Sequence, residues 1–196
     1  MTLPAGLQAL IEETDANERE ARAIVDGLDD RQANWQPDEG RGWSVVQCLD
    51  HLARMNPFYV EAVLPRVRAA AKHPVGSFEG LRPTWIGAKF VASLEPPVTR
   101  RFKAPNARVV PAAQMPVADA VASYLHSHTR YRELVSLSAG FDPNRVSVPN
   151  PFLKWVWMRV STILLVIPAH DRRHLWQARN VLAHPDFPGS ASSPSD

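Results

Sequence analysis

Apolar side chains recur every three or four positions in four long stretches of this chain, and this helical spacing is the feature that most limits its fold. Three of the stretches cover roughly residues 6–28, 117–138 and 150–184, and the remaining one begins after Ser44. No stretch shows the strict alternation of apolar and polar residues that predicts a strand. We therefore predict an all-α fold.

The best-defined helix start in the sequence lies at Ser44. Gln47 follows three residues later, so each of the two side chains can accept a hydrogen bond from the other residue's backbone N–H, which is a capping box. Trp43 and Cys48 occupy the positions of the hydrophobic staple that often accompanies such a start. The pattern predicts a helix that begins directly after Ser44.

Prolines predict further helix boundaries, because proline lacks an N–H and crowds the preceding turn. Pro57 and Pro65 fall inside the second helix, and we expect them to kink or divide it, with Asn56 as an alternative new N-cap. Asn150 followed by Pro151 has the same pattern of an N-cap and a first-turn proline. We therefore predict that the fourth helix starts at this pair.

The segment 74–116 differs from the helical stretches because it holds seven prolines. That density excludes a long helix and predicts an irregular insertion, or lid, between the second and third helices. Apolar residues such as Trp85 and Phe90 predict that it packs on the body of the protein. A chain of 196 residues has the length of one domain. We place this domain at 1–184, followed by a disordered polar tail at 185–196.

Charge, cysteine content and hydropathy limit the partners of the protein. The net charge of +2 argues against a dedicated nucleic-acid binder, although 66–108 holds nine basic and two acidic residues. The single cysteine, Cys48, cannot form an internal disulfide, which fits a reducing compartment. The N-terminus lacks the features of a signal peptide, and the apolar stretch 160–169 is shorter than the ~20 residues of a membrane span. We expect a cytoplasmic protein with neither nucleic acid nor membrane as a partner.

Three histidines carry the strongest functional signal. His170 and His174 are four residues apart, so they lie one turn apart on the same helix face as the apolar Ile167. His51 follows Cys48 by three residues and also lies on an apolar face. Imidazoles from two facing helices can bind one divalent metal ion and leave positions open for water or substrate. The alternative is that each histidine is a hydrogen-bonded core residue.

The residues around these histidines resemble a known family. The sequences GWSVVQCLDHL at 42–52 and HDRRHLWQ at 170–177 look like segments of the DinB-like superfamily, in the same order and with a similar separation. Members of that superfamily are four-helix bundles in which one histidine of the second helix and an HxxxH pair of the last helix bind a divalent metal. The resemblance implies such a bundle here, with His51, His170 and His174 as the metal ligands.

The resemblance also implies a function. Better-understood relatives are bacillithiol S-transferases and mycothiol-dependent maleylpyruvate isomerase. By this resemblance we expect zinc or nickel as the metal, which would activate a low-molecular-weight thiol or water to attack a small electrophilic substrate. The protein would then be a metal-dependent thiol S-transferase or hydrolase, and a homodimer is consistent with the resemblance. The alternative is a non-catalytic metal-binding or stress-response bundle in which the metal is structural.

Five further residues are candidates for lining the site or for contacting the ligands. Gln177 lies one turn beyond the last histidine of the pair, and His128 lies on the core stripe of the third helix. Asn17 and Glu18 interrupt the apolar face of the first helix, as the wall of an internal polar site would. Asp171 can orient an imidazole or act as a base. Its rotation of about 100° from the preceding histidine favours an arginine partner or solvent instead.

Other candidates are weaker, and we assign no catalytic residue from the sequence. Arg100, Arg101 and Lys103 of the insertion are candidates for holding the carboxylates of a thiol cofactor, with a solvated loop as the alternative. Cys48 lies one turn from His51, but a small buried core residue is the simpler interpretation.

Overall fold

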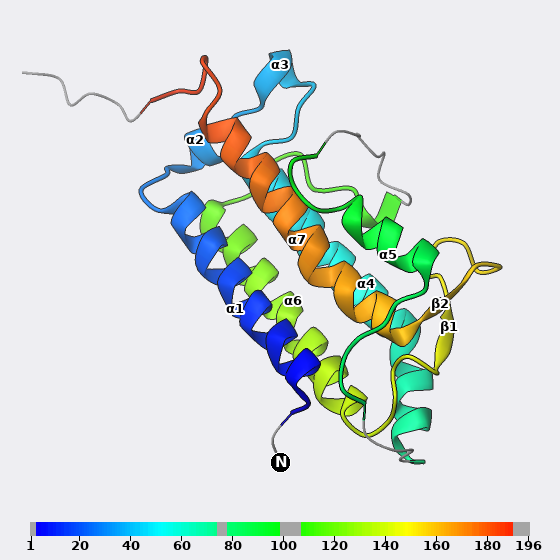
Figure 1. Cartoon of the computed structure of the whole chain (residues 1–196). Helices are drawn as coiled ribbons and strands as arrows, with labels where there is room; N and C mark the ends of the chain where they lie inside the picture. Colours follow the sequence, from blue (N-terminus) through cyan, green and yellow to red (C-terminus); the bar gives the residue numbers. More distant parts are fainter. Residues whose placement is uncertain (1–2, 74–77, 99–106, 190–196) are drawn as a thin grey trace, which may run out of the picture.

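The computed structural model describes residues 3–73, 78–98 and 107–189 and confirms the all-α fold (Figure 1). Its body consists of four long helices: α1 (Ala5–Val25), α4 (Val45–Ala71), α6 (Val117–Ser138) and α7 (Val160–Leu182). α1 and α4 each pack against both α6 and α7, so the helices close into a bundle around a common core. The predicted capping box at the start of α4 is present between Ser44 and Gln47.

The directions of the helices explain the long insertion. α1 and α7 run one way and α4 and α6 run the other way, so α4 and α6 are parallel neighbours (Figure 1). A short turn cannot join two parallel helices, and the chain must travel back along the bundle before α6 begins. The shorter path from α1 to α4 holds α2 (Asp30–Ala33) and α3 (Pro37–Gly40) at one end of the bundle (Figure 1).

The described part of the insertion contains a regular helix. α5 (Trp85–Ala92) begins after Thr84, whose hydroxyl accepts a hydrogen bond from the N–H of Gly87, and a short 3-10 helix covers Ala107–Val109. α5 packs so closely on α7 that a Cβ at Gly87 would lie 2.6 Å from the hydroxyl oxygen of Thr162. The insertion therefore packs on the body, as expected, but it includes a helix that its proline count did not predict.

We expected Pro57 and Pro65 to kink or divide the second helix, and the division is wrong. α4 is one helix that continues through both Pro57 and Pro65. Asn56 is not a new N-cap, because it is fully buried in the interior of α4 and its side-chain amide donates hydrogen bonds to residues of α6 and α7. Packing against neighbouring helices thus outweighs the local cost of the two prolines.

The predicted start of the fourth helix at Asn150 is also wrong. Residues Ser147–Pro149 form β1 and Trp157–Arg159 form β2, and the two strands pair antiparallel in a small hairpin. The Asn150 side chain accepts hydrogen bonds from the N–H groups of Phe152 and Leu153, so it stabilises the hairpin loop instead of a helix end. α7 begins only after β2.

The beginning of the C-terminal tail contacts the bundle. Phe187 packs edge-on against Trp35, with 5.6 Å between the ring centroids. The carbonyl of Pro188 accepts a hydrogen bond from the side-chain amide of Gln32 at 3.0 Å. The remaining part of the tail for which we predicted disorder, 190–196, lies outside the described residues.

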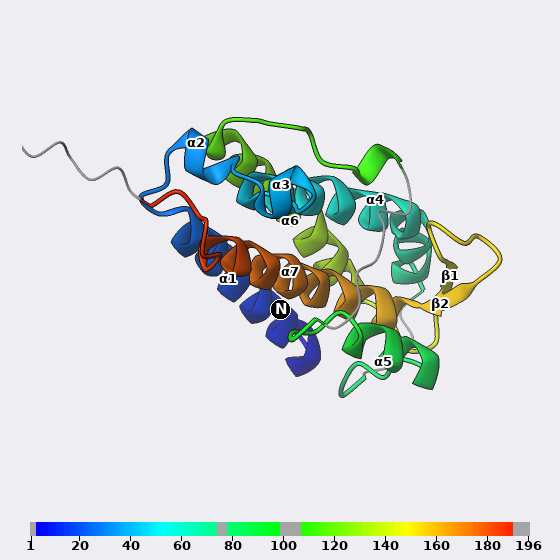
Figure 2. The same cartoon turned by 90° about the horizontal axis from the view of Figure 1, so that it is seen from above.

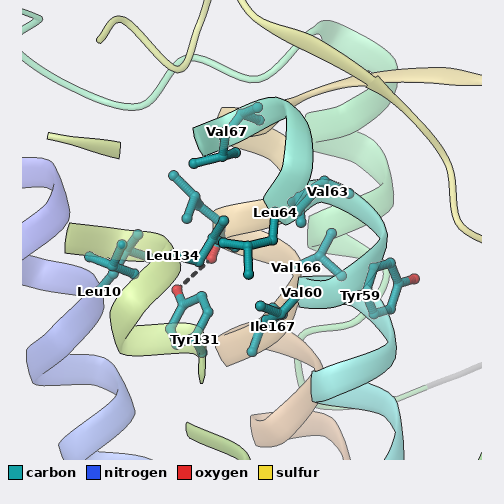
Figure 3. Close-up of a cluster of buried hydrophobic side chains, with 14 of the residues drawn as sticks. Leu10, Tyr59, Val60, Val63, Leu64, Val67, Tyr131, Leu134, Val166 and Ile167 are labelled. Carbon is teal, nitrogen blue, oxygen red and sulfur yellow. Dashed lines mark hydrogen bonds between the residues drawn. The ribbon is translucent and has the colours of Figure 1, made fainter. Parts of the chain in front are cut away.

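Buried hydrogen bonds compensate for the proline inside α7. Pro168 has no N–H, so the carbonyl of Leu164, one turn earlier, lacks its usual helical donor. The Tyr131 hydroxyl of α6 donates to this carbonyl at 2.7 Å, within the buried apolar cluster shown in Figure 3. Asn17 of α1 donates to the carbonyl of Pro168 itself at 3.1 Å. Both contacts hold α7 against its neighbours at the point where its own ladder is interrupted.

We predict that Tyr131→Phe lowers the free energy of unfolding by about 1–2 kcal/mol, because the buried Leu164 carbonyl then loses its donor. Urea denaturation followed by circular dichroism measures this change. Tyr59→Phe, in the same apolar cluster, is the matched control and should change stability by less than about 0.5 kcal/mol. Equal losses in the two variants would contradict the role given to the Tyr131 hydroxyl.

Candidate metal centre

The structure brings together the three histidines that the sequence singled out. His170 and His174 lie one turn apart on α7 and face His51 on the neighbouring α4. One nitrogen from each ring can be chosen so that all three lie within 4.8 Å of one another. The Nε2 atoms of His170 and His174 are 3.2 Å apart. Three imidazoles from two helices therefore converge on one small volume.

Hydrogen bonds fix which nitrogen two of these rings present to the site. Nδ1 of His51 donates to the backbone carbonyl of Val109 at 2.6 Å, and Nδ1 of His174 donates to the side-chain oxygen of Gln177 at 3.0 Å. With the proton on Nδ1, the lone pair of Nε2 remains available to a metal. Gln177, predicted as a residue near the site, thus supports a ligand directly.

The electrostatics keep the three rings neutral. Burial lowers the pKa of His51, His170 and His174. The pKa of His170 and that of His174 are lowered further by the neighbouring histidines and by the positive charge of Arg173. Neutral imidazole is the form that binds a metal ion, so no proton has to be displaced near pH 7.

The donor set fits a divalent cation. Ligand nitrogens held at ~2.0–2.1 Å from a tetrahedral metal are about 3.4 Å apart, close to the 3.2 Å between the two Nε2 atoms of α7. The same distance suits a hydrogen bond between the two rings, with one Nε2 as donor, so an ion would take the place of that shared proton. The buried Nδ1 of His170 also has no hydrogen-bond partner among the described residues. Among the described residues, the group of side chains that could bind one ion consists of these three histidines.

Trp43 covers the site, which sequence reasoning missed. Its ring stacks on His174 with 5.5 Å between centroids and lies tilted against His51 at 4.8 Å. The sequence predicts Trp43 as part of the hydrophobic staple and gives it no place at the histidines. Helical spacing could not reveal this position, because Trp43 precedes the N-cap Ser44 and lies outside α4.

A second polar cluster lies beside the metal site in the bundle core. Nδ1 of His128 donates to Glu18 at 2.9 Å, and Nε2 of His128 donates to Asp171 at 2.9 Å. Burial lowers the pKa of His128, but the charges and hydrogen bonds of Asp171 and Glu18 outweigh burial and raise it above its ordinary value. Asn56 donates to the other oxygen of Asp171 at 3.1 Å. Both ring nitrogens of His128 therefore face a carboxylate.

The cluster corrects the interpretation of Asp171. The sequence favoured an arginine partner or solvent for this residue, but it is buried and accepts hydrogen bonds from His128 and Asn56. The preference failed because α7 is buried on several faces, against α1, α4 and α5. Asp171 and Glu18 hold His128, and in the described part of the chain neither is hydrogen-bonded to a metal-site histidine. Asn17 donates to the Pro168 carbonyl.

The weaker candidates from the sequence are Cys48 and three basic residues of the insertion, and none of them is found at the histidine site among the described residues. Cys48 is buried in an apolar cluster, where burial raises its pKa, and it does not join the histidine group. Arg100, Arg101 and Lys103, predicted to hold carboxylates of a thiol cofactor, lie outside the described residues.

We predict that Gln177→Leu weakens zinc binding about tenfold or more, because His174 loses the acceptor that orients its ring. Competition with a chromogenic chelator measures the affinity. Gln8→Leu, an exposed substitution on α1, is the control and should bind zinc like the unaltered protein. Equal affinities of the two variants would remove Gln177 from the site.

Comparison with known proteins agrees with this geometry. The family model described as the DinB superfamily matches residues 13–178, a range that includes His51, His170 and His174. No curated protein and no solved structure gives a match. Because the family model matches most of the chain and the chain has the helical architecture described above, this protein belongs to the DinB superfamily.

Proposed function

We propose that this protein is a metal-dependent enzyme that transfers a low-molecular-weight thiol to a small electrophilic substrate or hydrolyses that substrate. The observation that carries the proposal is the convergence of three neutral imidazoles in a group that has no fourth such ligand among the described residues. A tetrahedral metal held this way keeps a position for an exogenous ligand, as catalytic sites do and closed structural sites do not.

His51, His170 and His174 would hold the ion, and imidazole ligands fit zinc or nickel. A bound divalent cation stabilises the deprotonated form of a thiol or a water molecule and so supplies a nucleophile near pH 7. The protein's own contribution is orientation and exclusion of solvent. The Val109 carbonyl and Gln177 fix two of the rings, and the indole of Trp43 covers them.

A reducing cytoplasm is the compartment that suits this proposal. A low-molecular-weight thiol is kept reduced there. Cys48, the only cysteine of the chain, is buried, and burial raises its pKa, so it does not compete as a thiolate. The partner in the reaction is a small molecule.

One observation favours a second candidate, a structural metal. The ligands come from α4 and α7, and His51 is also bonded to the insertion at Val109. An ion at this point would join three parts of the chain and stabilise the fold without any turnover.

We predict that the purified protein, incubated with zinc and then dialysed, retains about one ion per chain. His170→Ala and His174→Ala should each reduce the retained zinc by about tenfold, because two imidazoles bind far more weakly than three. Elemental analysis measures the content. His126→Ala, an exposed histidine of α6, should leave it unchanged. Zinc retained by all variants alike would place the metal elsewhere.

Turnover separates the two candidate functions. We predict that the zinc-loaded protein consumes a thiol in the presence of a generic electrophile, or hydrolyses that electrophile, and that product masses distinguish thiol addition from water addition. His170→Ala should abolish the rate. A chelator should also lower the melting temperature of the unaltered protein by several degrees. Loss of thermal stability without turnover for a panel of thiols and electrophiles would favour the structural metal.

A further inference from the structure

Three tryptophans are exposed on two segments of the chain, the start of α5 and the β1–β2 hairpin. Trp85 begins α5, and Trp155 and Trp157 belong to the hairpin that includes β2; they are 71%, 79% and 56% exposed. The start of α5 lies next to the hairpin (Figures 1 and 2). A hydrogen bond of 3.2 Å from the Arg159 guanidinium to the Arg82 carbonyl joins the two segments. With two further exposed apolar residues they form what we call the aromatic patch: Trp85, Ile86, Leu153, Trp155 and Trp157.

Basic side chains contact this patch. The Lys89 ammonium lies 4.0 Å from the ring centroid of Trp85, and the Arg66 guanidinium lies 4.8 Å from that of Trp157. These are cation–π contacts at the surface, and both tryptophan residues remain more than half exposed. Lys154, also exposed, sits between the apolar residues of the hairpin loop.

The segments that carry the patch contain no acidic residue. The sequence from residue 143 to residue 170, which includes the hairpin, has neither Asp nor Glu. The same is true of residues 81–94, which include α5. Exposed indole rings with only positive charges on their own segments are unlike an ordinary solvated surface, where both signs are interspersed.

We propose that the aromatic patch docks this protein on the surface of an anionic phospholipid bilayer. Tryptophan rings favour the interface between headgroups and acyl chains, and lysine and arginine are attracted to anionic headgroups. A second copy of the chain is a poorer occupant, because a symmetric contact would set two positively charged surfaces against each other. Two apolar aliphatic side chains add area that a membrane surface can bury, Ile86 and Leu153.

The proposal departs from the expectation that a membrane is no partner. That expectation rested on the absence of a spanning segment, and among the described residues no helix has the length and hydropathy to cross a bilayer. Docking on a surface needs neither, because it uses side chains of short segments. The inference is independent of the metal and of the proposed reaction, since none of the histidines lies in the patch.

Co-sedimentation with lipid vesicles tests the proposal. We expect the full chain to pellet with vesicles of phosphatidylcholine and phosphatidylglycerol at roughly two to one, and to stay in the supernatant with phosphatidylcholine alone. Lys154→Glu should lower the apparent partition coefficient about tenfold, because an attraction becomes a repulsion. Trp155→Ser should lower it by a similar factor, because the loop loses its most exposed ring. Arg31→Glu, an exposed charge reversal on α2 at the other end of the bundle, is the matched control and should bind like the unaltered protein.

Several outcomes would overturn the proposal. One is equal pelleting with neutral and anionic vesicles, and another is pelleting that Lys154→Glu and Trp155→Ser leave unchanged. If the protein does not pellet but sedimentation velocity shows a dimer that Trp155→Ser dissociates, the patch binds a second copy instead. Circular dichroism of each variant shows whether it is folded, and the exposure of both side chains predicts that it is.

Discussion

A chain of buried and partly buried hydrogen bonds takes one side chain from each long helix of the bundle. Its members are Glu18 of α1, Asn56 of α4, His128 of α6 and Asp171 of α7. Sliding any of the four helices by one turn would leave a buried charge or amide without its partner, which is far more costly than losing an apolar contact. The network therefore fixes the register of the helices. The metal site depends on that register, because His170 precedes Asp171 directly and His51 lies five residues before Asn56.

Much of the fold could be predicted because local signals and packing agree. The start of α4 follows from the Ser44 capping box, and both ends of α6 follow from its apolar spacing. The errors arise where a local signal has two physical meanings. Asn150 before a proline can cap a helix or a hairpin loop, since its side chain accepts backbone N–H bonds in either setting. Strands of three residues are also too short to show alternation.

The candidate site also has one part that local sequence signals predict and another part that only the packed bundle shows. The spacing of His170 and His174 and the apolar face of His51 are properties of single helices, so the sequence alone brings these residues forward. The residues that orient them are harder to predict. Gln177 is local to α7, but the acceptor for His51 is a backbone carbonyl 58 residues away, which no residue type reveals. The partners of Asp171 come from α4 and α6, and only the packed bundle shows them.

The bond between His51 and the carbonyl of Val109 has a consequence for how this protein can change. Every amino acid carries the same main-chain oxygen, so point replacements at position 109 that still fill the pocket would keep this anchor. Insertions or deletions between α4 and the 3-10 turn would instead shift the oxygen away from the ring. The segment between α4 and Val109 can therefore change its amino-acid composition, but its length is constrained because the Val109 carbonyl must reach the His51 ring.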